Sequence, residues 1–189
     1  MNTIEAITEI LKREGVKYLP CFPTTPVIEA AALGGIRPIV CRQERVGVGI
    51  ADGISRVSNG DQMGVFAMQY GPGAENAYAG IASAFSDSVP LLLLPLGHLR
   101  ERAGIAPHYS SLKGYAEITK AIEQLNAPNR TSDIMRRAFA GLRQGRGGPM
   151  AVEIPADIAL EDVSEESFYY VATRPAASQG NPGDIQAAA

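Results

Sequence analysis

The stretch Val89-Pro90-Leu91-Leu92-Leu93-Leu94-Pro95-Leu96 is the longest apolar run in the chain. Four successive leucines show no alternation between apolar and polar positions, so they predict a strand that is buried on both faces. The run contains two prolines and is far shorter than the roughly 20 residues that a membrane-spanning helix needs. Strands buried on both faces belong to parallel sheets that helices cover from both sides. The run therefore predicts an α/β fold.

The segments around this run alternate between helical and strand patterns, as expected for a parallel sheet covered on both faces. Asn2 and Glu5 predict a capping box at the start of a first helix, and Gly15 predicts its end. The other predicted helices are Val27–Leu33, Glu44–Val57, Gly73–Phe85 and Thr131–Leu142. The other predicted strands are Val16–Leu19, Pro38–Cys41, Met63–Met68, Ile118–Ile122 and Met150–Ile154. We expect a three-layer sandwich with a mainly parallel sheet covered by helices on both faces.

Composition excludes several classes of protein. With 189 residues, 46% of them hydrophobic and 20% charged, the chain has the make-up of a soluble globular domain. The net charge is -3, and the densest basic stretch, Arg136 to Arg146, is broken by apolar residues and glycines, so a nucleic-acid partner is not expected. The first residues lack the features of a secretory signal, which favours a cytoplasmic location without a membrane anchor. Cys21 and Cys41 lack C-x-x-C spacing, and we expect free, buried thiols.

The composition changes near the C-terminus. From Ala172 onward Ala, Ser, Gly, Asn and Pro dominate, which is typical of an interdomain linker. We therefore expect one domain over residues 1–171, followed over 172–189 by a linker and the start of a truncated central domain. Ala187 to Ala189 are predicted to belong to the start of a helix.

Glu44 is the first candidate for chemistry, within Arg42-Gln43-Glu44-Arg45-Val46-Gly47-Val48-Gly49-Ile50-Ala51-Asp52-Gly53. A glutamate in the first turn of a helix can simply complement the helix dipole. Glu44, however, follows a predicted strand, and ligands of parallel α/β sheets bind beyond the carboxyl ends of the strands. The same segment contains Gly47-x-Gly49-x-x-Asp52, which fails as a dinucleotide fingerprint. Asp52 occupies the place of the third glycine, and no acidic residue follows at Met63 to Gln69.

Two further segments also connect a strand and a helix. Gln69-Tyr70-Gly71-Pro72-Gly73-Ala74-Glu75-Asn76 places glycines on both sides of a proline, which allows a tight turn and a close approach by a ligand. Ser86-Asp87-Ser88-Val89-Pro90 precedes the leucine run, and Asp87 there is expected to have a local structural role.

The three segments, in this order and at this spacing, resemble thiamine-diphosphate enzymes of the acetolactate synthase and pyruvate oxidase group. The corresponding stretches of that family read roughly R-H-E-Q-G-A-A-H-A-A-D-G, S-G-P-G-A-T-N and D-S-V-P. The similarity extends from the first helix to the Met150–Asp157 strand and into the linker. It implies a pyrimidine-binding domain in which Glu44 activates the cofactor, by a hydrogen bond between its carboxyl group and N1′ of the aminopyrimidine. The function implied is an acetolactate synthase-like decarboxylase or carboligase acting on a 2-oxo acid.

The resemblance also implies roles for other residues. Besides Glu44, the residues near the cofactor would be Pro23, Thr24, Tyr70, Gly71 and Asn76. Gln43, Ser110 and Ser111 would lie on the substrate side. Gln43 stands where many relatives have histidine, and Tyr70 where many have serine or threonine. Because these differences fall on the substrate side, the resemblance does not fix the substrate.

Family members bind the diphosphate through Mg²⁺ in a second domain with a G-D-G…N-N signature, which is absent from this sequence. No metal ligand is expected within this chain. The resemblance implies that the active site forms against the diphosphate-binding domain of another subunit, in a homo-oligomer, either a dimer or a tetramer. Three interpretations stay open: the N-terminal part of a longer chain, the small subunit of a split 2-oxo acid decarboxylase, or a non-catalytic α/β binding domain.

Overall fold

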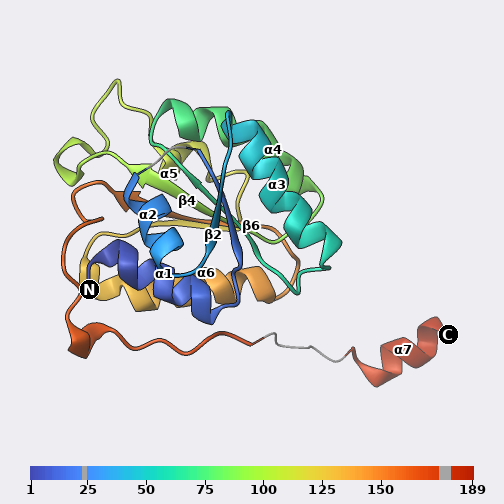
Figure 1. Cartoon of the computed structure of the whole chain (residues 1–189). Coiled ribbons are helices and arrows are strands. Elements are labelled where there is room, and N and C mark those ends of the chain that lie inside the picture. Colours follow the sequence, from blue (N-terminus) through green and yellow to red (C-terminus); the bar gives the residue numbers. More distant parts are fainter. Residues whose placement is uncertain (23–24, 175–179) are drawn as a thin grey trace.

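The computed structural model describes residues 1–22, 25–174 and 180–189 (Figure 1). Within them, six strands form one sheet in the order β2-β1-β3-β4-β6-β5, and every neighbouring pair is parallel. The strands are β1 (Tyr18–Cys21), β2 (Arg37–Val40), β3 (Gly64–Met68), β4 (Leu91–Gly97), β5 (Ala121–Gln124) and β6 (Pro149–Pro155). The helices are α1 (Thr3–Arg13), α2 (Thr25–Leu33), α3 (Glu44–Val57), α4 (Pro72–Ser86), α5 (Ser111–Gly114), α6 (Thr131–Arg143) and α7 (Pro182–Ala188). Short 3-10 turns are η1 (Arg100–Arg102), η2 (Pro128–Arg130) and η3 (Glu165–Ser167).

Helices cover both faces of the sheet. Figure 1 shows α1, α2 and α6 on one face and α3 and α4 on the other, in agreement with the contacts between elements. Each face has its own apolar core, one around Ile7 and Phe139 and the other around Phe66 and Ile81. The predicted three-layer α/β sandwich is therefore confirmed. In the part of the chain that the structure describes, no helix is both long and apolar enough to traverse a bilayer.

The leucine run forms the centre of the molecule. Every residue of β4 and of its neighbour β6 is buried, as the unbroken apolar pattern predicts. The two strands run in register from Leu91 beside Pro149 to Gly97 beside Pro155. Their carboxyl ends therefore bring Gly97 and the residues after it next to the end of β6.

Two predicted strands begin later than expected because nearby residues complete turns. Gly15 has a φ of +82°, and the amide of Val16 donates to the carbonyl of Leu11. This is the Schellman arrangement that ends many helices. Val16 therefore belongs to the end of α1, and β1 starts at Tyr18 instead of Val16. Similarly, the amide of Ile118 donates to Tyr115 in a turn, so β5 covers Ala121–Gln124 instead of Ile118–Ile122.

Close packing of α3 against the sheet depends on glycines at the contact. A Cβ atom on Gly47 would lie 2.2 Å from the ring of Phe66, and one on Gly64 would lie 1.9 Å from the carbonyl oxygen of Ala51. Helix α3 can therefore pack closer to β3 than a helix with larger residues at these positions. Its N-terminus is thereby held firmly at the carboxyl edge of the sheet.

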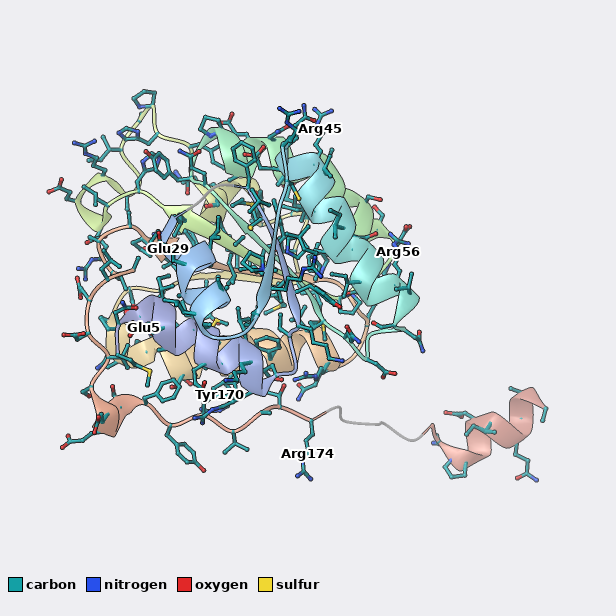
Figure 2. All side chains as sticks on the ribbon, viewed as in Figure 1. Glu5, Glu29, Arg45, Arg56, Tyr170 and Arg174 are labelled. Carbon is teal, nitrogen blue, oxygen red and sulfur yellow. The ribbon has the colours of Figure 1, made fainter. Side chains whose placement is uncertain are left out.

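The segment after β6 returns across α1 and α6 and is anchored there. The carboxylate of Glu14 accepts hydrogen bonds from the hydroxyl of Tyr170, at 2.5 Å, and from the amide of Thr173, at 2.8 Å, and it pairs with Arg143. Figure 2 shows Tyr170 where this segment passes α1. Residues 180–189, which include α7, are exposed.

The two cysteines lie side by side at the ends of β1 and β2. Both are buried and free, as predicted. The amide of Cys41 donates to the carbonyl of Cys21 at 2.8 Å.

Candidate active site

Glu44 is a buried carboxylate at the carboxyl edge of the sheet. It is the first residue of α3, directly after the turn that leaves β2, and only 7% of its surface is exposed. The preceding residue, Gln43, has the extended backbone of an N-cap, with no capping hydrogen bond from its side chain. Arg45, the next residue, extends outward at the same end of α3 (Figure 2). A glutamate is seldom buried unless its oxygens have partners, so its hydrogen bonds identify its environment.

The two oxygens of Glu44 have different surroundings. Asn76, on α4, donates from Nδ2 to Oε2 at 2.6 Å. Oε1 accepts no hydrogen bond from any residue that the structure describes, and a Cβ atom on Gly73 would lie 3.0 Å from it. Glycine at position 73 therefore leaves space beside this oxygen. One oxygen is fixed by the protein, and the other is available to a ligand.

The turn between β3 and α4 forms the second wall of this space. Gly71 is the N-cap of α4 with φ and ψ of 58° and -116°, a conformation that favours glycine, and Pro72 begins the helix. On the side that faces the protein core, the hydroxyl of the fully buried Tyr115 donates to the carbonyl of Ala74 at 2.6 Å. Burial, more than any neighbouring charge, raises the pKa of Tyr115, so its hydroxyl stays a donor. The first turn of α4 is thus held from the inside of the protein.

Three aromatic rings continue the edge of the sheet beyond this turn. Tyr70, which follows β3, stacks at a tilt on His98, which follows β4, with 4.7 Å between the ring centroids. His98 in turn lies 4.5 Å from the ring of His108. Tyr70 and His108 are exposed and His98 is partly buried. Both histidines of the chain therefore lie beside the predicted cofactor turn.

The two serines predicted on the substrate side have different positions. Ser110 caps the short helix α5 by accepting a hydrogen bond from the amide of Lys113. Ser111 is buried and donates its hydroxyl hydrogen to the carboxylate of Glu153 on β6, which also accepts from Nε2 of Gln124 at 2.6 Å. The hydroxyl of Ser111 is therefore bonded within the protein.

The structure brings together Glu44, Asn76 and the turn that begins at Gly71, and it places Tyr70 beside them. Gln43 is exposed at the start of α3. Pro23 and Thr24 lie outside the described residues. Sequence reasoning overlooked Glu153, although one signal was present: it is the one charged residue in the apolar strand Pro149–Pro155.

Comparison with known proteins identifies the family. A family model described as "Thiamine pyrophosphate enzyme, N-terminal TPP binding domain" matches residues 1–124. The chain belongs to this family. Thiamine pyrophosphate is the compound also called thiamine diphosphate, so the resemblance found in the sequence is confirmed.

Acetolactate synthase large subunits are relatives within the family. The chain is 30% identical over 173 residues to the "Probable acetolactate synthase large subunit" of Methanocaldococcus jannaschii, covering 89% of this chain and 29% of that protein. It is 31% identical over 174 residues to the "Acetolactate synthase isozyme 3 large subunit" of Escherichia coli, covering 84% and 28%. For the "Acetolactate synthase large subunit" of Lactococcus lactis the identity is 30%, covering 85% and 29%. The chain thus spans less than a third of the length of these relatives.

The residues around Glu44 fit the aminopyrimidine part of thiamine diphosphate. A ring with nitrogen donors and acceptors needs a carboxyl oxygen without a protein partner and a space next to it. Oε1 of Glu44 provides the oxygen, and the glycine at position 73 provides the space. Asn76 prevents the carboxyl group from turning away because it holds Oε2.

Proposed function

We propose that this chain is the pyrimidine-binding part of a thiamine-diphosphate enzyme that acts on a 2-oxo acid as an acetolactate synthase-like decarboxylase or carboligase. Glu44 is the residue that activates the cofactor. The proposal rests above all on the buried carboxyl group of Glu44, which has one oxygen fixed by Asn76 and the other open beside Gly73. When bound, thiamine diphosphate supplies a nucleophilic thiazolium carbon and an electron sink for decarboxylation.

The hydrogen bonds of Glu44 define where its proton resides in this proposal. The amide of Asn76 donates to Oε2, so this oxygen acts as an acceptor. A proton on the carboxyl group is therefore held at Oε1, the oxygen beside Gly73, where a ring nitrogen can share it. Burial keeps water from competing for that proton. Asn76 is in this respect a positioning residue for Glu44.

The neighbouring residues complete the proposed site. Gly71 allows the backbone of the turn before α4 to approach the cofactor, and Tyr70 lies at the same edge. Pro23 and Thr24 are expected to bind the cofactor as well. Gln43 is exposed at the mouth of the Glu44 site, on the proposed substrate side. Ser110, the N-cap of α5, and Ser111, its first residue, are proposed for the substrate side as well.

A partner domain is needed for the diphosphate and Mg²⁺, and one face of the chain suits it. Helices α3 and α4 carry exposed apolar side chains along their outer surface, namely Val46, Val57, Tyr78 and Phe85. Relatives are more than three times as long as this chain, since it covers 28–29% of them. We propose that the diphosphate-binding domain of another subunit packs against α3 and α4 in a homo-oligomer.

A substitution of Glu44 tests the proposal. In the complete enzyme, Glu44→Gln should slow hydrogen exchange at C2 of bound thiamine diphosphate and the turnover of pyruvate by about 10²–10⁴-fold, the usual contribution of a positioned acid or base. Asn76→Ala should slow both less strongly, with thiamine diphosphate binding still measurable by calorimetry. Glu29→Gln, a change at an exposed site on α2, is the matched control. An unchanged exchange rate in Glu44→Gln would refute the role of Glu44 and favour a non-catalytic binding domain.

A further inference from the structure

Tyr115 places a polar atom inside an otherwise apolar core. It is the C-cap of α5 and belongs to the buried cluster on the α3 and α4 face of the sheet. Its hydroxyl oxygen lies 2.6 Å from the carbonyl oxygen of Ala74 and 3.4 Å from Sδ of Met68. A hydroxyl group has one hydrogen to donate, and the shorter contact identifies Ala74 as its acceptor. A phenylalanine would fill the same space without a polar atom, so the bond to Ala74 is what distinguishes a tyrosine here.

The first turn of α4 receives little other support from side chains. Its N-cap is Gly71, which has no side chain that could bond the free amides of the turn, and Pro72 follows it. Among the residues that the structure describes, Tyr115 provides the one side chain that donates to the backbone of residues 71–76. The hydroxyl of Tyr115 therefore takes part in fixing the position of this turn.

This turn carries the groups that surround the carboxyl group of Glu44. Ala74 lies between Gly73, where a Cβ atom would be 3.0 Å from Oε1, and Asn76, whose Nδ2 is 2.6 Å from Oε2. A displacement of the Ala74 carbonyl would therefore move the amide of Asn76 relative to Glu44. Burial is the main cause of the raised pKa of Tyr115, and the charge of Glu44 contributes to it, which supports their proximity.

Tyr115 is itself held by residues outside α4. Its amide donates to the carbonyl of Ser111 at 2.9 Å, and its carbonyl accepts a hydrogen bond from Oγ1 of Thr119 at 2.8 Å. The hydroxyl of Ser111 donates in turn to Glu153, on the central strand β6. Because these bonds connect Tyr115 to the sheet, its hydroxyl is a fixed point from which the turn of α4 can be positioned.

We infer that Tyr115 is a positioning residue for cofactor activation, because its bond to Ala74 keeps the amide of Asn76 on Oε2 of Glu44. The inference rests on the proposed function, since it names a further residue on which the action of Glu44 depends. Tyr115 acts through α4 and contacts neither the cofactor nor the substrate. A misplacement of about 1 Å at a reacting group can slow a reaction by about 10²-fold. Loss of one hydrogen bond should displace the turn by less, so a smaller effect is expected.

A substitution that removes only the hydroxyl group tests this inference. In the complete enzyme with saturating thiamine diphosphate, Tyr115→Phe should slow C2 hydrogen exchange and lower kcat for pyruvate by about 10-fold. KM for pyruvate and the Kd of thiamine diphosphate, measured by calorimetry, should change by less than about 3-fold, because the misplaced group acts on proton transfer. Tyr109→Phe is the matched control, since the hydroxyl of Tyr109 is also buried but forms no hydrogen bond with any described residue. It should leave all four quantities unchanged.

A double variant tests whether Tyr115 acts through Asn76. In the Asn76→Ala background the amide that Tyr115 positions is absent, so Tyr115→Phe should slow C2 hydrogen exchange by less than about 3-fold. Losses that multiply in the double variant would refute the inference, because Tyr115 would then act independently of Asn76.

The outcomes separate this inference from the proposed function. If Glu44→Gln slows C2 hydrogen exchange and Tyr115→Phe, with native circular dichroism, does not, the inference is refuted and the proposed function stands. A lower Tm of Tyr115→Phe would then show a purely structural role for the hydroxyl. An equal loss in Tyr109→Phe would also refute the inference. If the wild-type enzyme shows no C2 hydrogen exchange, both the inference and the proposed function are refuted.

Discussion

Glu44 and Glu153 are both buried glutamates at the carboxyl edge of the sheet, but their hydrogen bonds differ. Both oxygens of Glu153 accept a donor from the protein, namely Ser111 and Gln124, whereas only Oε2 of Glu44 does, from Asn76. A buried carboxylate with every oxygen bonded is held in place by the protein. The difference between the two residues therefore lies in which oxygen remains available, and it supports the proposed role of Glu44.

Only one of these two glutamates was identified from the sequence. Glu44 follows a predicted strand within a segment that resembles a family motif, so local pattern was sufficient. The partner of Glu153, Ser111, is 42 residues away, and the loop between Gly97 and Gly114 has no periodic pattern. Local patterns carry no information about such long-range pairing, which is why the contact between Ser111 and Glu153 required the structure.

Cys21 gives a prediction about pH. Burial and the neighbouring Cys41 raise the pKa of the Cys21 thiol from 9.0 to about 11. A pKa raised by folding means that the native state keeps the proton more tightly, so the stabilising effect is complete below pH 9 and is lost as the pH rises through 11. The free-energy difference between wild type and Cys21→Ala should therefore shrink between pH 8 and 11, by at most about 2–3 kcal/mol. Urea unfolding with a reductant measures this difference, and a constant difference would contradict the prediction.

At the scale of elements, helices were predicted more accurately than strands. The predicted helix Glu44–Val57 has the observed bounds of α3. Four helices, α1 to α4, end in the same Schellman arrangement, in which a residue with positive φ is followed by an apolar residue or a glycine whose amide bonds back to the helix. In α1 the residue after the positive-φ glycine is Val16, which a simple apolar pattern assigns to the following strand. A predicted strand boundary is therefore wrong where the C-terminal cap of a helix includes an apolar, β-branched residue such as Val16.

The contact between α3 and β3 gives a prediction about packing. Gly47→Ala places a Cβ atom 2.2 Å from the buried ring of Phe66, so the helix or the ring must move. We expect a loss of about 1–3 kcal/mol in the free energy of unfolding, as for other overpacked cores. Gly49→Ala, on the same helix, meets no atom within 4 Å and should be neutral or stabilise by about 0.4–1 kcal/mol. Urea unfolding of both variants measures the difference, and equal midpoints would show that α3 does not depend on a small residue at position 47.

At the scale of the whole molecule, the sheet brings residues from four strand ends to one edge. Glu44 follows β2, Tyr70 follows β3, His98 follows β4 and Glu153 belongs to β6. In a parallel sheet all these ends point the same way, so the fold class predicted from Val89–Leu96 already implied where a ligand would bind. The order β2-β1-β3-β4-β6-β5 was not predicted, because strand order depends on tertiary packing that local patterns do not contain.

The C-terminal segment is attached to helices α1 and α6 mainly through Glu14, and this attachment can be measured. The side chain of Glu14 is fully buried and bonds Tyr170, Thr173 and Arg143, whose own side chain is only 14% exposed. Glu14→Ala leaves Arg143 without its partner, and breaking such a buried pair costs about 3–5 kcal/mol. The amide of Thr173, which now donates to Glu14, should also lose its protection against hydrogen exchange. Glu9→Ala, which removes a more exposed pair with Arg13 on the same helix, should cost about 0.2–1 kcal/mol. A similar cost for both variants, with Thr173 still protected, would show that the segment is held by its apolar contacts, such as those of Phe168, and not by Glu14.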